Sequence, residues 1–160
     1  MRSGSAAIDI HAPPEVVFDL LHDYSRRLDW DPFLREARLL NEALVADLGV
    51  SSRCVARRAV GGLAMDTVYV SFTRPTVAAV KMTHGPFFLR SFAASICQDR
   101  INNNRTRVTY RYSFKSQPRS LAFLVEPVVS RVFHRETCRR LAALKRFLED
   151  GRPTAHVIPR

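Results

Sequence analysis

Apolar and polar positions alternate with a period of two in several parts of the chain. Near its start, Ile8 and Ile10 alternate with polar neighbours, which predicts a half-buried strand over residues 6–11. The clearest alternation covers residues 105–114, where arginine, threonine and serine separate the apolar positions. Its apolar face consists of Val108, Tyr110, Tyr112 and Phe114. Such a segment is typical of an antiparallel strand with one face buried and one in water.

Further strands are predicted between these two segments, where short apolar runs are separated by turn residues. The predicted ranges are 38–41, 53–59, 65–73, 76–83 and 88–98. The breaks carry glycine, proline or asparagine, as at Gly61-Gly62, Gly85-Pro86 and the hairpin tip 102–104. Because strands joined by short turns pair antiparallel, we expect a meander.

Helical periodicity replaces this alternation at two places. After Pro13 and Pro14, apolar residues recur at helical spacing up to Tyr24, and a proline is tolerated in the first helical turn. A second short helix or turn is expected over residues 25–34, with a break before Pro32. A long C-terminal helix is predicted over residues 119–149.

Pro127 falls inside this long helix and is expected to kink it or to divide it into a short lead-in and a longer helix. Gly151 is a plausible stop. Residues 1–150 are therefore predicted to form a single domain, and residues 151–160, which contain two prolines and no pattern, a flexible tail.

Composition narrows the class of protein. A chain of 160 residues suits one domain with a substantial core, and no apolar run reaches the roughly 20 residues of a membrane-spanning helix. We see no secretory signal, and three widely spaced cysteines suggest reduced thiols, so we expect a cytoplasmic protein. The net charge of +10 comes almost entirely from arginine. It indicates either an anionic partner or an arginine-rich proteome, and the sequence does not decide between them.

Three segments resemble a known superfamily. Residues 8–21 read IDIHAPPEVVFDLL, residues 24–33 read YSRRLDWDPF, and residues 106–110 read TRVTY. Together with the order of elements they resemble the START-like, or SRPBCC, superfamily, which includes polyketide cyclase/dehydratase-like proteins. The resemblance implies an α+β helix-grip fold: a curved antiparallel sheet of six to seven strands wrapped around a long C-terminal helix, with two short helices after the first strand.

The resemblance also implies a ligand cavity between the sheet and the long helix. A sheet that bends around one helix leaves a gap that side chains or a ligand must fill. The residues expected to line it are Trp30, Phe33, Phe92, Ile96, Tyr110, Tyr112, Phe114, Val129, Val132 and Phe133. Two inward tyrosine hydroxyls would either orient a polar ligand group or bond to neighbouring backbone.

Few residues point to chemistry. There is no nucleophile elbow, phosphate-binding loop or paired-cysteine motif, so we expect no cofactor and no metal, and the catalytic residues are unknown. His134 and Cys138 share a helix face, but two ligands do not make a zinc site. Asp29 and Asp31 flank the only tryptophan and are interpreted as helix or turn caps rather than an acid–base pair.

Three functions remain open. The first is binding of a hydrophobic or amphipathic small molecule, such as a lipid, polyketide or isoprenoid. The second is an enzyme of the polyketide cyclase/dehydratase type, which would require an ionisable group in the cavity. The third is a basic lipid carrier at an anionic membrane surface, suggested by arginine rows on residues 105–111 and 131–139. Nucleic acid is not favoured as a partner, because the aromatics lie on the strand face opposite the arginines. The oligomeric state is unknown.

Overall fold

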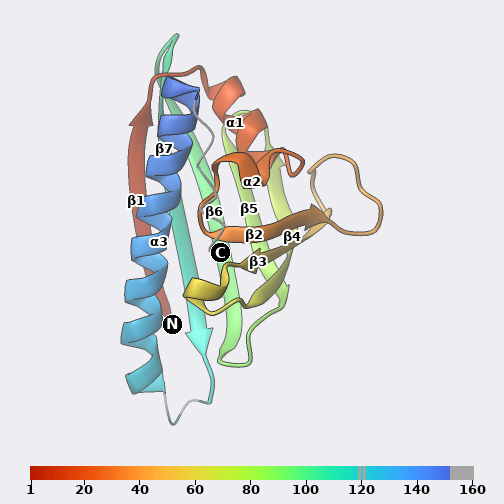
Figure 1. Cartoon of the computed structure of the whole chain (residues 1–160), viewed down its shortest axis with the longest axis vertical. Helices are drawn as coiled ribbons and strands as arrows, with labels where there is room; N and C mark the ends of the chain where they lie inside the picture. Colours follow the sequence, from red (N-terminus) through yellow and green to blue (C-terminus); the bar gives the residue numbers. More distant parts are fainter. Residues whose placement is uncertain (119, 121, 152–160) are drawn as a thin grey trace, which may run out of the picture.

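A single antiparallel sheet of seven strands is the largest element of the protein (Figure 1). The computed structural model describes residues 1–118, 120 and 122–151. The strand order is β1-β7-β6-β5-β4-β3-β2. The strands are β1 (Arg2–Ile10), β2 (Leu34–Leu39), β3 (Ser51–Ala56), β4 (Ala64–Thr73), β5 (Val77–His84), β6 (Leu89–Asn102) and β7 (Arg105–Ser116). Strands β2 to β7 are consecutive neighbours, which confirms the predicted meander.

Strand β1 lies at the far edge of the sheet and pairs with the last strand rather than with β2. Its register places Ile8 opposite Val108 and Gly4 opposite Tyr112. The chain therefore has to cross from one edge of the sheet to the other, and the segment that crosses contains α1 (Pro14–His22) and α2 (Arg27–Trp30). This crossing brings the two short helices over the region between the sheet edges (Figure 1).

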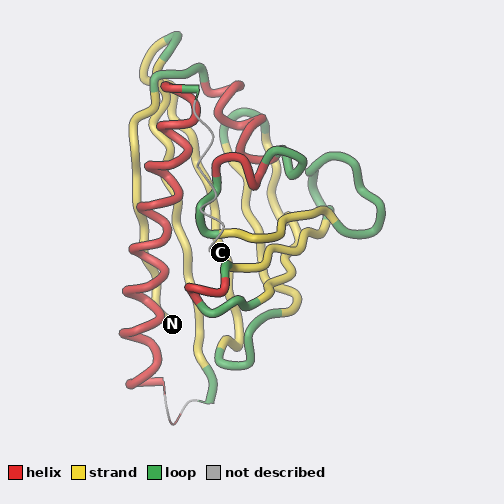
Figure 2. The backbone as a smooth tube through the Cα atoms, in the orientation of Figure 1, coloured by secondary structure: helices red, strands yellow, loops and turns green. Residues whose placement is uncertain are grey.

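The long helix α3 (Ala122–Asp150) runs beside the same edge of the sheet. It contacts β1 and β7, whereas β2, β3 and β4 lie on the other side of the molecule (Figure 2). A short 3-10 turn, η1 (Arg58–Val60), follows β3. None of the described helices combines the length and the apolar character that a membrane span requires.

One hydrophobic cluster of the core lies where α1, α2 and the C-terminal half of α3 meet. Ile10 and Val17 are fully buried there, and they pack in one cluster with Trp30 and Leu144. A second cluster lies farther along β6 and β7, around Leu89, Ala94, Tyr112 and Phe114. Between these clusters the sheet and α3 leave room for a cavity.

The observed elements agree with most of the predicted ranges, with two differences. The structure confirms the helix-grip architecture, with seven strands, but β2 begins at Leu34, earlier than the predicted 38–41. Pro127 is expected from the sequence to kink the last helix or to divide it, and division is wrong, because α3 is continuous from Ala122 to Asp150. Pro127 removes only one backbone donor, toward Phe123, and this lies in an exposed first turn where water can satisfy the carbonyl. Most of the predicted tail lies outside the described residues.

Candidate ligand-binding cavity

A cavity of about 340 Å³ lies between the sheet and α3. Most of the residues that the sequence predicted for its wall do line it: Phe33, Phe92, Ile96, Tyr110, Tyr112, Val129, Val132 and Phe133. The strand residues come from β6 and β7, where alternate side chains point to the same face. The helix residues 129, 132 and 133 are spaced to share one face of α3. Such a volume falls within the roughly 300–1,000 Å³ that is usual for small-molecule sites.

Two predicted wall residues do not line the cavity, Trp30 and Phe114. Trp30 is only 2% exposed and packs in the core, with the Arg27 guanidinium 4.8 Å from its ring centroid. Phe114 is buried, and its ring meets that of Phe133 edge-on at 5.4 Å. Both side chains therefore lie outside the wall, whereas Arg27 and Phe33, which neighbour Trp30 in the sequence, line the cavity.

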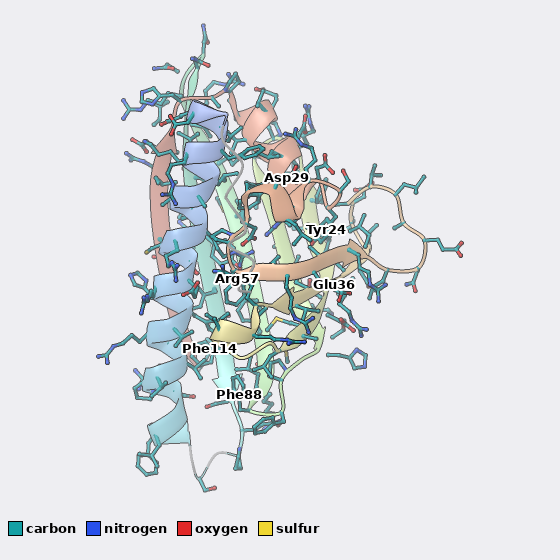
Figure 3. The ribbon with its side chains drawn as sticks, viewed as in Figure 1. Tyr24, Asp29, Glu36, Arg57, Phe88 and Phe114 are labelled. Atoms are coloured by element: carbon teal, nitrogen blue, oxygen red, sulfur yellow. The ribbon has the colours of Figure 1, made fainter. Side chains whose placement is uncertain are left out.

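Further wall residues, which sequence reasoning did not select, come from the middle strands, from loops and from α3. They include Met65 on β4, Val80 on β5, Leu63 and Phe88 in the segments before β4 and β6, and Val128 on α3, of which Leu63 and Val128 are also exposed to solvent. Figure 3 labels two of the wall residues, Tyr24 near the short helices and Phe88 near the start of β6. The alternation in residues 64–73 and 77–84 did identify strands, but the curvature that turns one face inward is not visible in a single strand.

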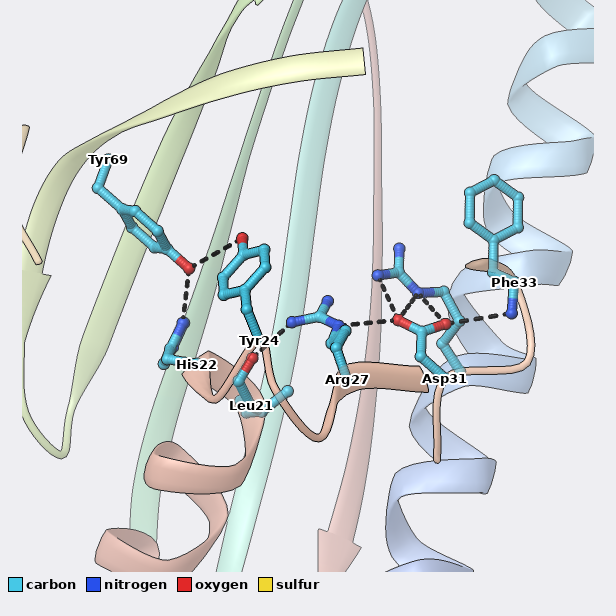
Figure 4. A network of polar contacts seen from close by, with 8 residues as sticks. Leu21, His22, Tyr24, Arg27, Asp31, Phe33 and Tyr69 are labelled. Atoms are coloured by element: carbon cyan, nitrogen blue, oxygen red, sulfur yellow. Dashed lines mark hydrogen bonds and ion pairs between the residues drawn. The ribbon is translucent and has the colours of Figure 1, made fainter. Parts of the chain in front are cut away.

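The end of the cavity beneath α1 is polar. His22 and Tyr69 are joined by a hydrogen bond of 2.9 Å between the imidazole Nδ1 and the phenol oxygen, and the Tyr24 hydroxyl lies 3.4 Å from that of Tyr69 (Figure 4). Burial lowers the pKa of His22 to about 3, with a further contribution from the Arg27 charge. Burial also raises the pKa of both tyrosines, so at neutral pH all three groups are uncharged.

Next to these groups lies a buried ionic cluster of Arg27, Asp31 and Arg140 (Figure 4). The Asp31 carboxylate accepts hydrogen bonds from Arg27 Nε at 3.0 Å and from Arg140 Nη2 at 2.8 Å, and Arg140 Nε lies 3.1 Å from both of its oxygens. Burial disfavours the charge of Asp31, but Arg140 and Arg27 hold its pKa below the ordinary value. The cluster joins α2 to α3, and both guanidinium groups line the cavity.

The two acids that flank Trp30 therefore have different roles, although the sequence predicted the same capping role for both. Asp31 does accept the backbone N–H of Phe33 at 3.1 Å, as a turn residue would, but it is completely buried and its main partners are the two arginines. Asp29 is half exposed and lies 3.8 Å from Arg26. The spacing of four between Arg27 and Asp31 was the one signal that could have indicated their pairing.

Further polar residues line the cavity, namely Cys54, Thr67, Ser95, Glu136 and Thr137. Glu136 pairs through Oε1 with Arg139 at 3.2 Å, while its buried Oε2 has no hydrogen-bond partner among the described residues. Burial raises the pKa of the Cys54 thiol, which keeps it protonated and a poor nucleophile. No group of three potential metal ligands occurs within residues 1–118, 120 and 122–151.

The hydroxyls of the two inward tyrosines, Tyr110 and Tyr112, differ in their hydrogen bonds. Tyr112 donates to the backbone carbonyl of Ser130 at 3.4 Å, as expected for a tyrosine that satisfies itself on neighbouring backbone. Within the described part of the chain, the Tyr110 hydroxyl makes no hydrogen bond, although it faces the cavity. Burial raises the pKa of Tyr110 against the opposing charges of Arg140 and Arg27, so this hydroxyl remains a donor at neutral pH.

The surface arginines are partly neutralised. Arg105 and Arg107 on β7 both pair with Asp9 on β1, at 3.2 and 2.8 Å. Arg131 and Arg135 on α3 are exposed and have no ion-pair partner among the described residues. Two of the three strand arginines therefore share one carboxylate, whereas in the helix row, over residues 131–139, only Arg139 has an ion-pair partner that the structure describes, Glu136.

Comparison with known proteins agrees with the fold. A family model described as polyketide cyclase/dehydrase and lipid transport matches residues 1–149. No curated protein matches the chain.

Solved structures show the same fold at low sequence identity. The Zhui aromatase/cyclase from Streptomyces sp. R1128 is 15% identical with a TM-score of 0.73, over 96% of this chain and 99% of that one. A START superfamily protein from Mycobacterium smegmatis is 13% identical with a TM-score of 0.72, over 92% and 97%. The protein XoxI from Bacillus cereus is 16% identical with a TM-score of 0.74, over 94% and 97%. These likenesses confirm the START-like helix-grip fold. Because the family match extends over residues 1–149, the chain belongs to the polyketide cyclase/dehydrase and lipid transport family.

Proposed function

We propose that the protein binds a hydrophobic or amphipathic small molecule in the cavity between the sheet and α3. The observation that carries this proposal is the cavity itself, of about 340 Å³, with a wall that is mostly apolar and with its polar groups gathered toward one end. An apolar wall with a few fixed polar groups is the usual composition of a small-molecule site. Family membership supports the proposal, since the family's description includes lipid transport.

The test is to fill the cavity without disturbing the sheet. Ala94 on β6 is buried and lines the cavity, whereas its neighbour Ala93 is exposed on the opposite face. Nile red, an uncharged apolar dye that fluoresces when it leaves water, serves as the probe. The wild type and Ala93→Phe should bind the dye with equal affinity, and Ala94→Phe should bind it at least about tenfold more weakly because its ring occupies the site. Equal binding by all three proteins would refute the proposal.

A second candidate function is catalysis of the polyketide cyclase/dehydratase type. The observation that favours it is that ionisable side chains with unused hydrogen-bonding capacity line the cavity, namely Glu136 and Tyr110. A carboxylate and a phenol could exchange protons with a bound poly-β-ketone. The experiment is to incubate a poly-β-ketone thioester with the wild type and with Glu136→Gln. Aromatic product formed by the wild type and lost in the variant would support catalysis, and equal product without protein would exclude it.

Action at a membrane surface is a third candidate, and it rests on two exposed aromatic side chains. Phe87 lies between the cavity residues Pro86 and Phe88, Phe123 lies in the first turn of α3, and they are 84% and 70% exposed. Arg131 and Arg135 on the same helix could attract anionic lipid. Co-sedimentation with anionic vesicles, lost with added salt and with Phe87→Ser, would support this candidate. Equally strong binding to neutral and to anionic vesicles would count against a role of the arginine charges.

A further inference from the structure

The ionic cluster at the polar end of the cavity contains more positive than negative charge. Arg27 and Arg140 face a single carboxylate, that of Asp31, so the cluster has a net charge of about +1. Its side chains are largely removed from water, with 9% of Arg27 and 19% of Arg140 exposed. Uncompensated charge is costly inside a protein unless something pairs with it. A cluster built only to join α2 to α3 would need one arginine for one aspartate.

The hydrogen-bonding capacity of these arginines is also incompletely used. Nε of Arg27 and both Nε and Nη2 of Arg140 donate to Asp31, and Nη1 of Arg27 donates to the carbonyl of Leu21. No described residue accepts a hydrogen bond from Nη2 of Arg27 or Nη1 of Arg140. Both side chains line the cavity, as does Tyr110, whose hydroxyl has no described partner. Three hydrogen-bond donors without described acceptors, on Arg27, Arg140 and Tyr110, therefore belong to residues that line the same cavity. The neighbouring Asp31 carboxylate neutralises only one of the two guanidinium charges.

We propose that Arg27, Arg140 and Tyr110 form an anion-binding subsite and that the ligand carries a singly charged oxygen acid, such as a carboxylate, on an apolar body. This inference rests on the proposed function, because it assigns the polar end of the same ligand. The acid would add the second negative charge that the cluster lacks and would accept from the three free donors. Arginine suits this role since its guanidinium stays charged and presents several donors in one plane.

The other acid in the cavity does not already neutralise the subsite. Glu136 lies one helical turn before Arg140, and its charge is paired with Arg139 at 3.2 Å. Its second oxygen is a buried acceptor without a described partner. In the proposed complex this oxygen suits a hydroxyl of the ligand, whereas the acid group is held at the arginine end. The predicted ligand is therefore an apolar molecule with an acid at one end, which excludes simple hydrocarbons and neutral isoprenoids as the best occupants.

The experiment compares three probes of equal chain length, decanoate, decanol and methyl decanoate, as competitors of bound Nile red at neutral pH. Decanoate is the most soluble in water of the three, so nonspecific partitioning would favour the neutral probes. The subsite predicts the opposite order, with decanoate binding at least about tenfold more tightly than methyl decanoate, as hydrogen bonds to a charged group would provide. Thermal melting confirms that each variant is folded.

Four variants test which residues cause the preference for decanoate over methyl decanoate. Arg140→Gln should abolish this preference, because Asp31 then pairs with Arg27 alone and the cluster becomes neutral. Arg140→Lys retains the charge and should retain part of the preference, which keeps the test valid should the glutamine variant not fold. Tyr110→Phe should reduce it, and Arg135→Gln, which removes an exposed charge from the same helix, should leave it unchanged.

The outcomes separate the subsite from the proposed function. Equal affinity of the wild type for all three probes, or a preference for decanoate that survives Arg140→Gln, would overturn the subsite and leave ligand binding intact. Failure of the dye and of every probe to bind the wild type would overturn both.

Discussion

Asp31→Asn is the substitution whose effect follows most directly from the structure. The change keeps the shape of the side chain and one oxygen that can accept the Phe33 N–H, but it removes the only carboxylate between two guanidinium groups. Arg27 and Arg140 would then lie beside each other in a site with little access to water. The substitution therefore tests whether α2 and α3 are held together by a buried ion cluster.

The magnitude comes from the burial of the cluster. Removal of one partner from a buried ion pair costs about 3–5 kcal/mol, because a charge is left unpaired inside the protein. A change of 1 kcal/mol shifts Tm by about 2–4 °C in a domain of this size, so we expect a loss of roughly 6–20 °C. Asp29→Asn is the matched control, because Asp29 flanks the same tryptophan but is half exposed. Its expected effect is within about 0.5 kcal/mol.

The assay is urea unfolding of the wild type, Asp31→Asn and Asp29→Asn at neutral pH, and the three unfolding free energies are then compared again at acidic pH. The pKa of Asp31 is lowered in the folded state, so its contribution to stability is present above the unfolded pKa and is lost as pH falls through the folded one. The difference between wild type and Asp31→Asn should consequently shrink below about pH 4, where the unfolded carboxylate takes up its proton. Equal unfolding free energies for the two aspartate variants at neutral pH would refute the account of the cluster.

Three further predictions concern single residues. The pKa of His22 is about 3 in the folded protein and 6.5 ordinarily, so between these pH values only the unfolded chain binds this proton. The free energy of unfolding should therefore fall by about 1.4 kcal/mol for each unit that the pH drops through this window. Urea unfolding measured at several pH values should show a weaker pH dependence for His22→Asn. Cys54 is half-buried in the cavity wall with a raised pKa and Cys138 is exposed, so peptide mapping after brief iodoacetamide treatment should find Cys138 alkylated first; faster labelling of Cys54 would contradict this order. A Cβ at Gly4 would overlap the Tyr112 ring, so Gly4→Ala should displace that ring toward the cavity and weaken Nile red binding, which a titration would measure.

Much of the fold could be predicted from local pattern, because each strand carries its own alternation. Residues 105–114 show one buried face in the sequence and in the structure. The positions at which Tyr110 and Val132 enter the cavity follow from this pattern together with the spacing along α3. Element bounds were less predictable where the apolar signal was weak, as at β2.

The polar end of the cavity was not predictable in the same way. The ion pair between Asp31 and Arg140 joins residues 109 positions apart, and the bond between His22 and Tyr69 spans 47. Such contacts depend on how α1, α2 and α3 meet, and the sequence around each residue resembles that of an ordinary exposed charge. Trp30 was misplaced for a related reason: nothing local indicates that Arg27 covers its ring.

The central claim is that the cavity between the sheet and α3 holds a small molecule. Native mass spectrometry of the protein purified from its own host tests it most directly, with Ala94→Phe and Ala93→Phe purified in parallel. The account predicts that the wild type and Ala93→Phe carry an additional mass that is released on denaturation, and that Ala94→Phe does not. The same additional mass on all three proteins would place the ligand elsewhere, and a wild type that carries no small molecule and takes up neither Nile red nor decanoate would contradict the claim.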